Sequence, residues 1–215
     1  MNSVEAAKKI ENFFQKYPTI TYKPKKVIFG PNSPNLFLFY IQSGVVRLYT
    51  LHPNGEHLVV LWLKPGLLFP LSQIFIDSPS HFYFETATEV KLSRAPIEEF
   101  IDFLEKETDC LFYLNRLVLE KSLAISQRIE LFLISNVEDR LRFLLVNLAK
   151  IFGETHNKKV LINYPIHHSE MASWICSTRE SVTRNLKELK KQSLISIEDQ
   201  KITINDFQLL EEKFL

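Results

Sequence analysis

Cysteine is scarce in this chain of 215 residues, and its scarcity argues against several kinds of site. The two cysteines, Cys110 and Cys176, are far apart in the sequence and have no partner at metal-ligand spacing. A disulfide framework, a zinc site and a four-cysteine iron–sulfur centre are therefore not expected. This cysteine usage is typical of a protein that works in a reducing compartment.

Long apolar runs and a surplus of charge of one sign are missing as well. No apolar run reaches the roughly 18 residues of a membrane span, and the N-terminal sequence lacks the apolar core of a signal peptide. We therefore expect a soluble protein that is not exported and has no membrane partner. The net charge is only +1, so total charge does not indicate nucleic-acid binding. Positive charge is concentrated locally instead, with three lysines between Lys187 and Lys191.

The hydrophobic pattern of the first half predicts one helix followed by many short strands. Residues 4–16 have helical spacing, with Ala7, Ile10, Phe13 and Phe14 on one side. From residue 19 to residue 96, short runs of β-branched and aromatic residues alternate with turn signals, of which Asn54-Gly55 is the strongest. This part of the chain therefore predicts a compact β-barrel or sandwich.

After Pro96 the periodicity becomes helical. A stripe of apolar residues predicts one long helix with a partner along its length. The stripe consists of Leu114, Val118, Ile125, Ile129 and Phe132. It could pack on the chain's own barrel or form the seam of a dimer, and its length favours the dimer. A further helix is predicted over residues 138–152, ending at Gly153, and residues 154–159 are interpreted as a linker.

Residues 169–190 predict two short helices separated by a tight turn. Ser177-Thr-Arg-Glu180 has the form of a capping box, which starts the second helix at about Thr178. Two sets of apolar residues can then pack against each other across the helices. They are Val182, Leu186 and Leu189 on the second helix and Met171, Trp174 and Ile175 on the first.

Polar side chains on the second helix face away from that core and suit the edges of DNA bases. Arginine pairs with guanine through two hydrogen bonds, and a carboxylate accepts from the cytosine amino group. The exposed set is Arg179, Glu180, Thr183, Arg184 and Lys187. A charged helix face alone is more commonly just solvated. Here the cap, the apolar core and a following hairpin pattern over residues 194–204 (a wing) occur together, which favours DNA binding.

An enzyme is not expected from this sequence. The local candidates for catalysis or metal binding are His167, His168 and Cys176, and no further ligand or carboxylate completes a set. Metal and catalytic residues are therefore predicted to be absent.

The sequence resembles the Crp/Fnr superfamily of bacterial transcription regulators, and more specifically the NtcA-type global nitrogen regulators of cyanobacteria and red-algal plastids. The segments that carry the resemblance are Gly44-Val-Val-Arg-Leu48, Phe82-Tyr-Phe84, Leu92-Ser-Arg-Ala-Pro-Ile-Glu98, Asp139-Arg-Leu-Arg-Phe-Leu-Leu145, Ser177-Thr-Arg179 and Val182-Thr-Arg184. The resemblance implies an α+β fold in three parts. These are a double-stranded β-helix (a jelly roll like cyclic-nucleotide-binding domains) over residues 1–107, a dimerisation helix over 108–136, and a winged helix-turn-helix over 137–215.

The resemblance also implies partners and DNA-contacting residues. Arg179, Glu180 and Arg184 match base-reading positions, and Ser177, Thr178 and Ser181 match contacts to the DNA backbone. The partners implied are double-stranded DNA with a palindromic site, RNA polymerase and a second copy of the chain. Nitrogen-responsive activation is the function implied, in a bacterial cytoplasm or a plastid stroma.

Two departures from the family pattern concern the DNA-binding segment. Cys176 stands in the turn where the family usually has glycine, which costs about 1 kcal/mol if the position needs a positive φ. Glu180 stands where nitrogen regulators commonly have an apolar residue, and it matches the catabolite-activator branch instead. The half-site, GTA-like or TGTGA-like, therefore stays open.

The sensor part departs from the family as well. A cyclic-nucleotide site of this superfamily contains a glutamate and an arginine, and neither is present in Gly66-Leu-Leu-Phe-Pro-Leu-Ser72 or Ser80-His-Phe-Tyr83. Cyclic AMP is therefore not expected, and no cofactor is predicted.

Nitrogen regulators of this type sense 2-oxoglutarate, through a loop, a strand arginine and two helix residues. The matching positions here are Phe69, Leu71 and Ser72 in the loop, His81 for the strand arginine, and Lys121 and Ser126 on the helix. Pro70 removes an amide donor from that loop. His81 and Lys121 could supply weaker positive charge, or they could be ordinary surface residues of a regulator that needs no ligand. Both readings stay open.

Overall fold

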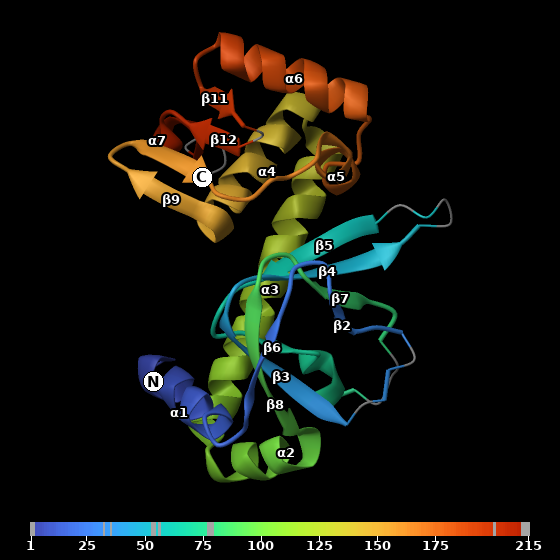
Figure 1. Ribbon diagram of the computed structural model, residues 1–215, viewed down its shortest axis with the longest axis vertical. Coiled ribbons are helices and arrows are strands. Elements are labelled where there is room, and N and C mark those ends of the chain that lie inside the picture. Colours follow the sequence, from blue (N-terminus) through green and yellow to red (C-terminus); the bar gives the residue numbers. More distant parts are fainter. Residues whose placement is uncertain are drawn as a thin grey trace. The chain divides into compact units, whose positions relative to one another are not determined.

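The computed structural model describes residues 3–31, 33–34, 36–52, 55, 57–76, 80–199 and 201–211 (Figure 1). The chain forms two compact units. Unit 1 contains Met1–Thr50 and Val60–Ile125, and unit 2 contains Leu51–Val59 and Ser126–Leu215. The long helix predicted as a separate segment is thus shared between the units.

Unit 1 is built on two four-stranded sheets, with strand orders β1-β8-β3-β6 and β2-β7-β4-β5. Register pairs such as Leu38 with Ala95 and Leu48 with Phe84 are antiparallel. The strands are β1 (Thr19–Tyr22), β2 (Val27–Phe29), β3 (Phe37–Ser43), β4 (Val46–Leu51), β5 (His57–Leu63), β6 (Leu68–Phe69), β7 (Tyr83–Thr86) and β8 (Val90–Pro96). Asn54 of the predicted hairpin lies outside the described residues, but the strands on either side of it are neighbours in one sheet.

Alternation along these strands buries one side of each sheet in a shared core. Phe69 is at its centre, with its ring stacked 5.2 Å from that of Phe39 and 5.0 Å from that of Phe84, measured between ring centroids. Ile41 and Leu92 are fully buried beside them. Such pairs add to the apolar area removed from water and hold the residues that follow β6 in place. Those residues form the short helix η1 (Leu71–Ile74).

Three helices complete unit 1 and make a second core. They are α1 (Ser3–Phe14), α2 (Ile97–Lys106) and the first part of α3 (Thr108–Ile134). α1 buries Ala6, Ile10, Phe13 and Phe14, so Ala6 takes the place predicted for Ala7. The helix begins and ends a little earlier than the range 4–16 predicted from periodicity.

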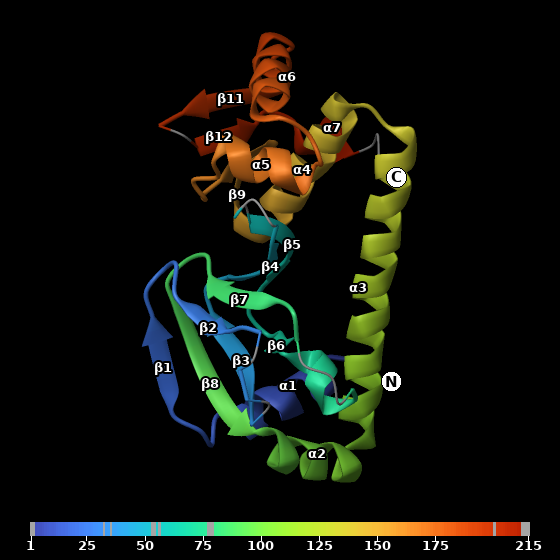
Figure 2. The same cartoon turned by 90° about the vertical axis from the view of Figure 1, so that its right-hand side faces the viewer.

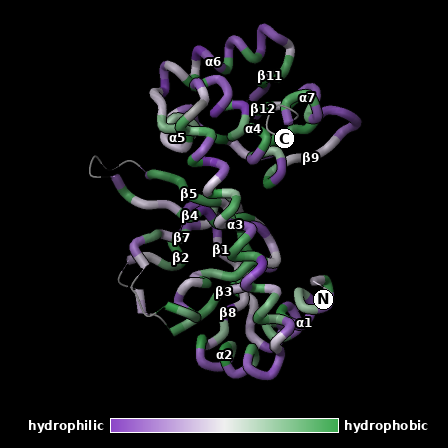
Figure 3. The backbone as a smooth tube through the Cα atoms, turned by 180° about the vertical axis from the view of Figure 1, so that it is seen from behind, coloured by the Kyte–Doolittle hydropathy of each residue, from purple (hydrophilic) through white to green (hydrophobic). Residues whose placement is uncertain are grey.

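α3 is one continuous helix of 27 residues (Figure 2). Its apolar stripe is only partly covered. Leu114 is buried, whereas Val118, Ile125 and Ile129 are 38–55% exposed. Further large apolar side chains of α3 are also exposed, and hydrophobic segments recur along the helix (Figure 3). The further exposed apolar side chains of α3 are Phe112, Leu119, Leu123 and Leu133. No helix of the described residues is long and apolar enough to cross a membrane.

Unit 2 combines helices with a third four-stranded sheet of order β11-β12-β10-β9. Its elements after α3 are α4 (Val137–Phe152), β9 (Gly153–His156), β10 (Lys159–Ile162), α5 (His168–Trp174), α6 (Arg179–Lys191), β11 (Ile195–Glu198), β12 (Lys201–Ile204) and α7 (Phe207–Glu211). The hairpin β11–β12 is the predicted wing. With the jelly roll, the long helix and this unit, the predicted fold class is confirmed.

The linker predicted over residues 154–159 is wrong, because these residues belong to the hairpin β9–β10. Asn157 makes its tight turn with a φ of 58°, a conformation that asparagine tolerates better than most residues. Gly153 ends α4 with an ordinary φ of −77°. Glycine is required there by close approach, because a Cβ would lie 2.1 Å from the Ala149 carbonyl oxygen and 2.6 Å from Val160 Cγ1.

Candidate nucleic-acid interface and effector cavity

The two short helices predicted over residues 169–190 are α5 and α6, and their predicted core is present. Met171, Trp174 and Ile175 are at most 4% exposed, as are the three apolar residues of α6. These are Val182, Leu186 and Leu189. Burial of six large side chains between helices and sheet fixes which face of α6 stays in solvent.

The turn between the helices has the hydrogen bonds of a Schellman motif. The Ser177 amide donates to the Ala172 carbonyl at 2.9 Å, and the Cys176 amide donates to the Ser173 carbonyl at 3.3 Å. The motif needs a left-handed residue at its fifth position, where glycine is preferred. Cys176 occupies that position with a φ of 51°. The positive φ that the sequence comparison raised for this position is therefore present.

The cap of α6 is one residue later than the sequence predicted. Thr178 is the N-cap, and its hydroxyl accepts from the Ser181 amide at 3.2 Å. Ser177 instead lies in the turn, half-buried. The capping box Ser177–Glu180 is wrong because the Schellman motif extends through Ser177 and delays the helix to Arg179. Thr178 and Ser181, predicted to contact the DNA backbone, are thus hydrogen-bonded to each other at the start of α6.

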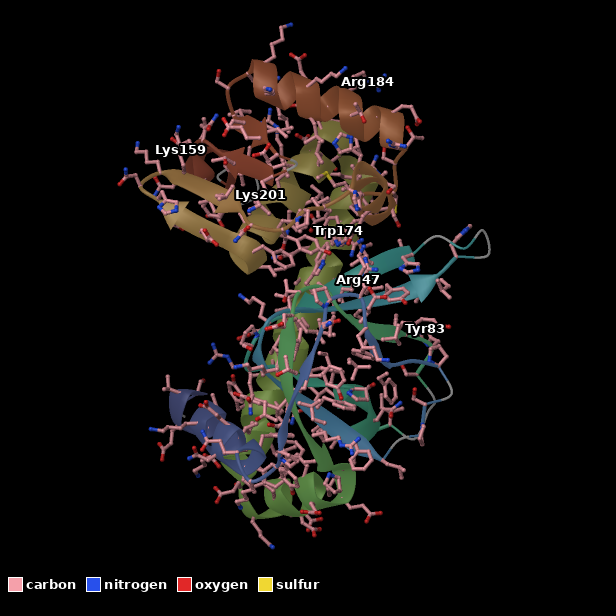
Figure 4. The ribbon with its side chains drawn as sticks, in the orientation of Figure 1. Arg47, Tyr83, Lys159, Trp174, Arg184 and Lys201 are labelled. Carbon is pink, nitrogen blue, oxygen red and sulfur yellow. The ribbon has the colours of Figure 1, made fainter. Side chains whose placement is uncertain are left out.

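The predicted base-reading side chains lie together on the exposed face of α6. Arg179, Glu180 and Arg184 are exposed and line one shallow groove with Thr183 and Lys187. Figure 4 shows Arg184 extending from this helix. Three cationic and one anionic side chain thus border a surface without buried apolar groups. A surface of this kind is suited to hydrogen bonding with base edges and phosphates.

Thr183 also connects this face to α5, a contact that the sequence analysis missed. Its hydroxyl donates to the Arg179 carbonyl at 2.8 Å, and His168 Nδ1 lies 2.8 Å from the same oxygen. Because the hydroxyl hydrogen is used by the carbonyl, Nδ1 is assigned as the donor to Thr183. Burial, followed by the charges of Arg179 and His167, lowers the pKa of His168.

Two arginines hold the C-terminal end of α5. Arg128 of α3 donates to the Trp174 carbonyl at 2.7 Å, and Arg140 of α4 donates to the Ile175 carbonyl at 3.2 Å. The Arg128 guanidinium also lies over the rings of Trp174 and Phe132. Carbonyls at a helix end lack intrahelical partners, and cationic donors satisfy them. Nothing in the sequence pattern singles out either arginine for this contact.

Four of the six positions matched to the family's effector site line one cavity in unit 1, and Ser126 is not among the residues that line it. Phe69, Leu71, Ser72 and Lys121 border a cavity of about 340 Å³ between the jelly roll and the first part of α3. His81 is exposed and is not among the residues that line it. It packs on Phe82, which does line the cavity, at 4.1 Å between ring centroids.

The lining of this cavity is strongly apolar. Leucines and phenylalanines from the strands form one wall, and α3 forms the other. Lys121 is the one charged residue among the described residues that line it. Partial burial, followed by the like charge of Lys64, lowers the pKa of the Lys121 ammonium. Among the described residues, no group of three or more His, Cys, Asp or Glu side chains could hold a metal.

Comparisons with known proteins agree with both parts of this geometry. Residues 19–107 match the family model of the cyclic nucleotide-binding domain, and residues 139–213 match that of the Crp-like helix-turn-helix domain. The two matches cover the jelly roll and the helix-turn-helix unit described above.

Similar proteins have the same two parts in one chain. The chain is 29% identical to the global nitrogen regulator of Nostoc sp. over 90% of its own length and 88% of that protein. It is also 29% identical to the global nitrogen regulator of Synechocystis sp., over 90% and 87%.

Among solved structures, a CRP/FNR-family transcriptional regulator from Thermus thermophilus superposes with a TM-score of 0.73. It has 25% sequence identity, and the match covers 91% of this chain and 97% of that one. The matched domains and the relatives are those of regulators and not of enzymes. This chain therefore belongs to the Crp/Fnr superfamily of DNA-binding transcription regulators.

Proposed function

We propose that the protein is a nitrogen-responsive transcription activator that binds a palindromic promoter site as a homodimer. The observation that carries the proposal is the exposed groove on α6, bordered by Arg179, Glu180 and Arg184. These side chains read bases in the major groove, and Ser177, Thr178 and Ser181 contact the flanking phosphates. The similarity to global nitrogen regulators supports nitrogen as the signal.

A second apolar face of α3, distinct from the predicted stripe whose Leu114, Val118 and Ile125 line the cavity, supports the homodimer. Leu119, Leu123 and Leu133 are 64–80% exposed in the single chain, on a helix long enough for several turns of coiled-coil packing. A second copy of α3 would remove this area from water. A symmetric dimer would place two α6 helices in successive major grooves, about 34 Å apart. The family resemblance also implies RNA polymerase as a further partner. It implies a bacterial cytoplasm or a plastid stroma as the location.

The cavity beside α3 supports regulation by a small molecule over a regulator without any ligand. A degenerate sensor would be expected to fill its interior with side chains, whereas about 340 Å³ remains open here. By resemblance, 2-oxoglutarate is the first candidate, with one carboxylate at Lys121. Such a ligand regulates DNA binding only if it binds one arrangement of α3 better than another.

Selection of bound sites from random DNA tests the proposal. We expect a palindrome whose half-sites are about one helical turn, or 10 base pairs, apart. The selected half-site would also decide between a GTA-like and a TGTGA-like sequence. Recovery of unrelated sequences, or of single half-sites alone, would contradict the dimeric regulator.

A further inference from the structure

The effector cavity of unit 1 has a chemistry that differs from what a dicarboxylate needs, and this inference rests on its proposed role as the effector site. One wall comes from the strands, where Leu63, Leu68, Phe69 and Phe84 are each at most 8% exposed. Leu63, Phe69 and Phe84 belong to the jelly-roll core, Leu68 belongs to the second core, and none of them can turn away from a ligand without leaving its core. The part of a ligand that reaches this wall must therefore be apolar.

The opposite wall is the first part of α3, and it carries the charge. Lys121 lies there between Val118 and Ile125, with Ser122 beside it. Ser72 and Ser80 add hydroxyl groups from the jelly-roll side. One cation with neighbouring hydroxyls can hold a single carboxylate group.

A second carboxylate has no matching group among the described residues of the lining. Among the described residues, no arginine or histidine borders the cavity, and Lys64, whose charge acts on Lys121, is exposed to solvent outside the lining. A dianion such as 2-oxoglutarate would place its second charge against leucine and phenylalanine side chains. Transfer of an unpaired carboxylate from water to such an apolar wall is strongly unfavourable.

We propose that this cavity binds a small monocarboxylate with an apolar, preferably aromatic, body, with the carboxylate at Lys121 and the body against Phe69 and Phe84. A ligand carboxylate beside the Lys121 ammonium offsets the cost of its partial burial. Aromatic bodies are favoured because the rings of Phe69, Phe82 and Phe84 line the cavity, where a ligand ring can meet their edges. The ligand touches α3 over three turns, from Leu114 to Ile125, so its binding can bias the position of this helix.

Calorimetry on the full chain with three probes that share a keto group tests this ligand class. Phenylpyruvate is a monoanion with an aromatic body, phenylacetone is its neutral counterpart, and 2-oxoglutarate is the dianion. We expect phenylpyruvate to bind at least about tenfold more tightly than either of the others. Equal or tighter binding of 2-oxoglutarate, or no binding of phenylpyruvate, overturns the proposal.

Variants assign the carboxylate to Lys121. Lys121→Met keeps the apolar stem, so we expect it to weaken phenylpyruvate binding about tenfold and leave phenylacetone binding unchanged. Lys91→Met, at an exposed residue of β8 outside the lining, should bind like the wild type. Lys121→Arg should retain binding and shows that a loss in Lys121→Met reflects charge and not misfolding. An unchanged affinity in Lys121→Met, or an equal loss in Lys91→Met, overturns the assignment.

The outcome is separable from that of the proposed function. If 2-oxoglutarate binds more tightly while the protein still selects a palindrome, the ligand class is wrong and the DNA-binding regulator stands. If no palindrome is selected, the proposed function fails whatever the calorimetry gives.

Discussion

The guanidinium of Arg128 lies 3.8 Å from the centre of the Trp174 ring and donates to the Trp174 carbonyl at 2.7 Å. One side chain of α3 thus contacts both the indole that anchors α5 and the backbone where α5 ends. Its burial lowers the Arg128 pKa to about 10, still well above neutral pH, so the contact is cationic under ordinary conditions. This pair connects the long helix directly to the helix-turn-helix.

Replacement of Arg128 by methionine should lower the free energy of unfolding by about 2–4 kcal/mol, because a cation–π contact and a charged hydrogen bond are lost. Denaturant unfolding measures this loss. Arg116→Met is the matched control on the same helix. Arg116 is largely exposed and pairs with Glu120 at 2.8 Å, so the control should lose less than about 1 kcal/mol. Equal losses in the two variants would contradict the role given to Arg128.

Cys176 offers a gain in stability. Its φ of 51° is unfavourable for a residue with a Cβ, so Cys176→Gly should raise the free energy of unfolding by up to about 1 kcal/mol. Cys176→Ala removes the thiol but keeps the Cβ, and it should give no such gain. Thermal unfolding of the three proteins compares them directly. A gain of the same size in the alanine variant would show that the thiol, and not the backbone, is responsible.

Leu123→Asp should break the proposed dimer without unfolding the chain. Leu123 is 65% exposed in the single chain, so its replacement removes little from the monomer core. Two buried aspartates at a symmetric seam would weaken dimerisation at least about tenfold. Sedimentation measures the dissociation constant. Leu209→Asp, at a residue 56% exposed on α7, is the control and should leave the dimer intact. Unchanged dimerisation of Leu123→Asp would remove α3 from the seam.

His168 predicts a dependence of stability on pH. Its pKa lies below the usual value of about 6.5 because of burial, so the folded chain binds this proton less readily than the unfolded chain. The His168 contribution to stability is therefore present above about pH 6.5 and is lost as the pH falls through the folded pKa. We expect the free energy of unfolding, measured with urea at several pH values in this range, to depend less steeply on pH in His168→Gln than in the wild type. His81→Gln, which removes an exposed histidine from unit 1, is the matched control. The same dependence of unfolding free energy on pH in the wild type and in His168→Gln would contradict the lowered pKa of His168.

The sequence pattern predicted the elements that depend on local periodicity. The core of α5 and α6 followed from the spacing of Val182, Leu186 and Leu189, because buried helix faces repeat every three or four residues. The sequence pattern placed the N-cap of α6 at Ser177, one residue before the observed cap Thr178. Both residues have a hydroxyl group that can cap a helix, and the preceding turn decides between them. The hairpin β9–β10 was missed because its strands are short and every residue of its first strand is exposed, so no alternation marks it.

Contacts between distant residues were beyond the reach of periodicity. The contact of Arg128 with Trp174 and that of His168 with Thr183 join residues 46 and 15 positions apart. Their chemistry is visible only once the helices are placed. The cavity residues Phe69, Leu71, Ser72 and Lys121 were found through family resemblance, whereas the apolar character of the whole lining emerges from the structure.

Specific reading of DNA by α6 is the central claim, and a binding titration of Arg184→Ala on two DNAs tests it most directly. The wild type, Arg184→Ala and Lys191→Ala are compared on the selected palindrome and on random DNA at one salt concentration. We predict that Arg184→Ala loses about 1–3 kcal/mol on the palindrome, with relaxed discrimination at one base pair of each half-site, and far less on random DNA. Lys191→Ala, outside the groove, should weaken both to a similar small extent. Equal weakening of Arg184→Ala on the two DNAs would contradict a base-reading role.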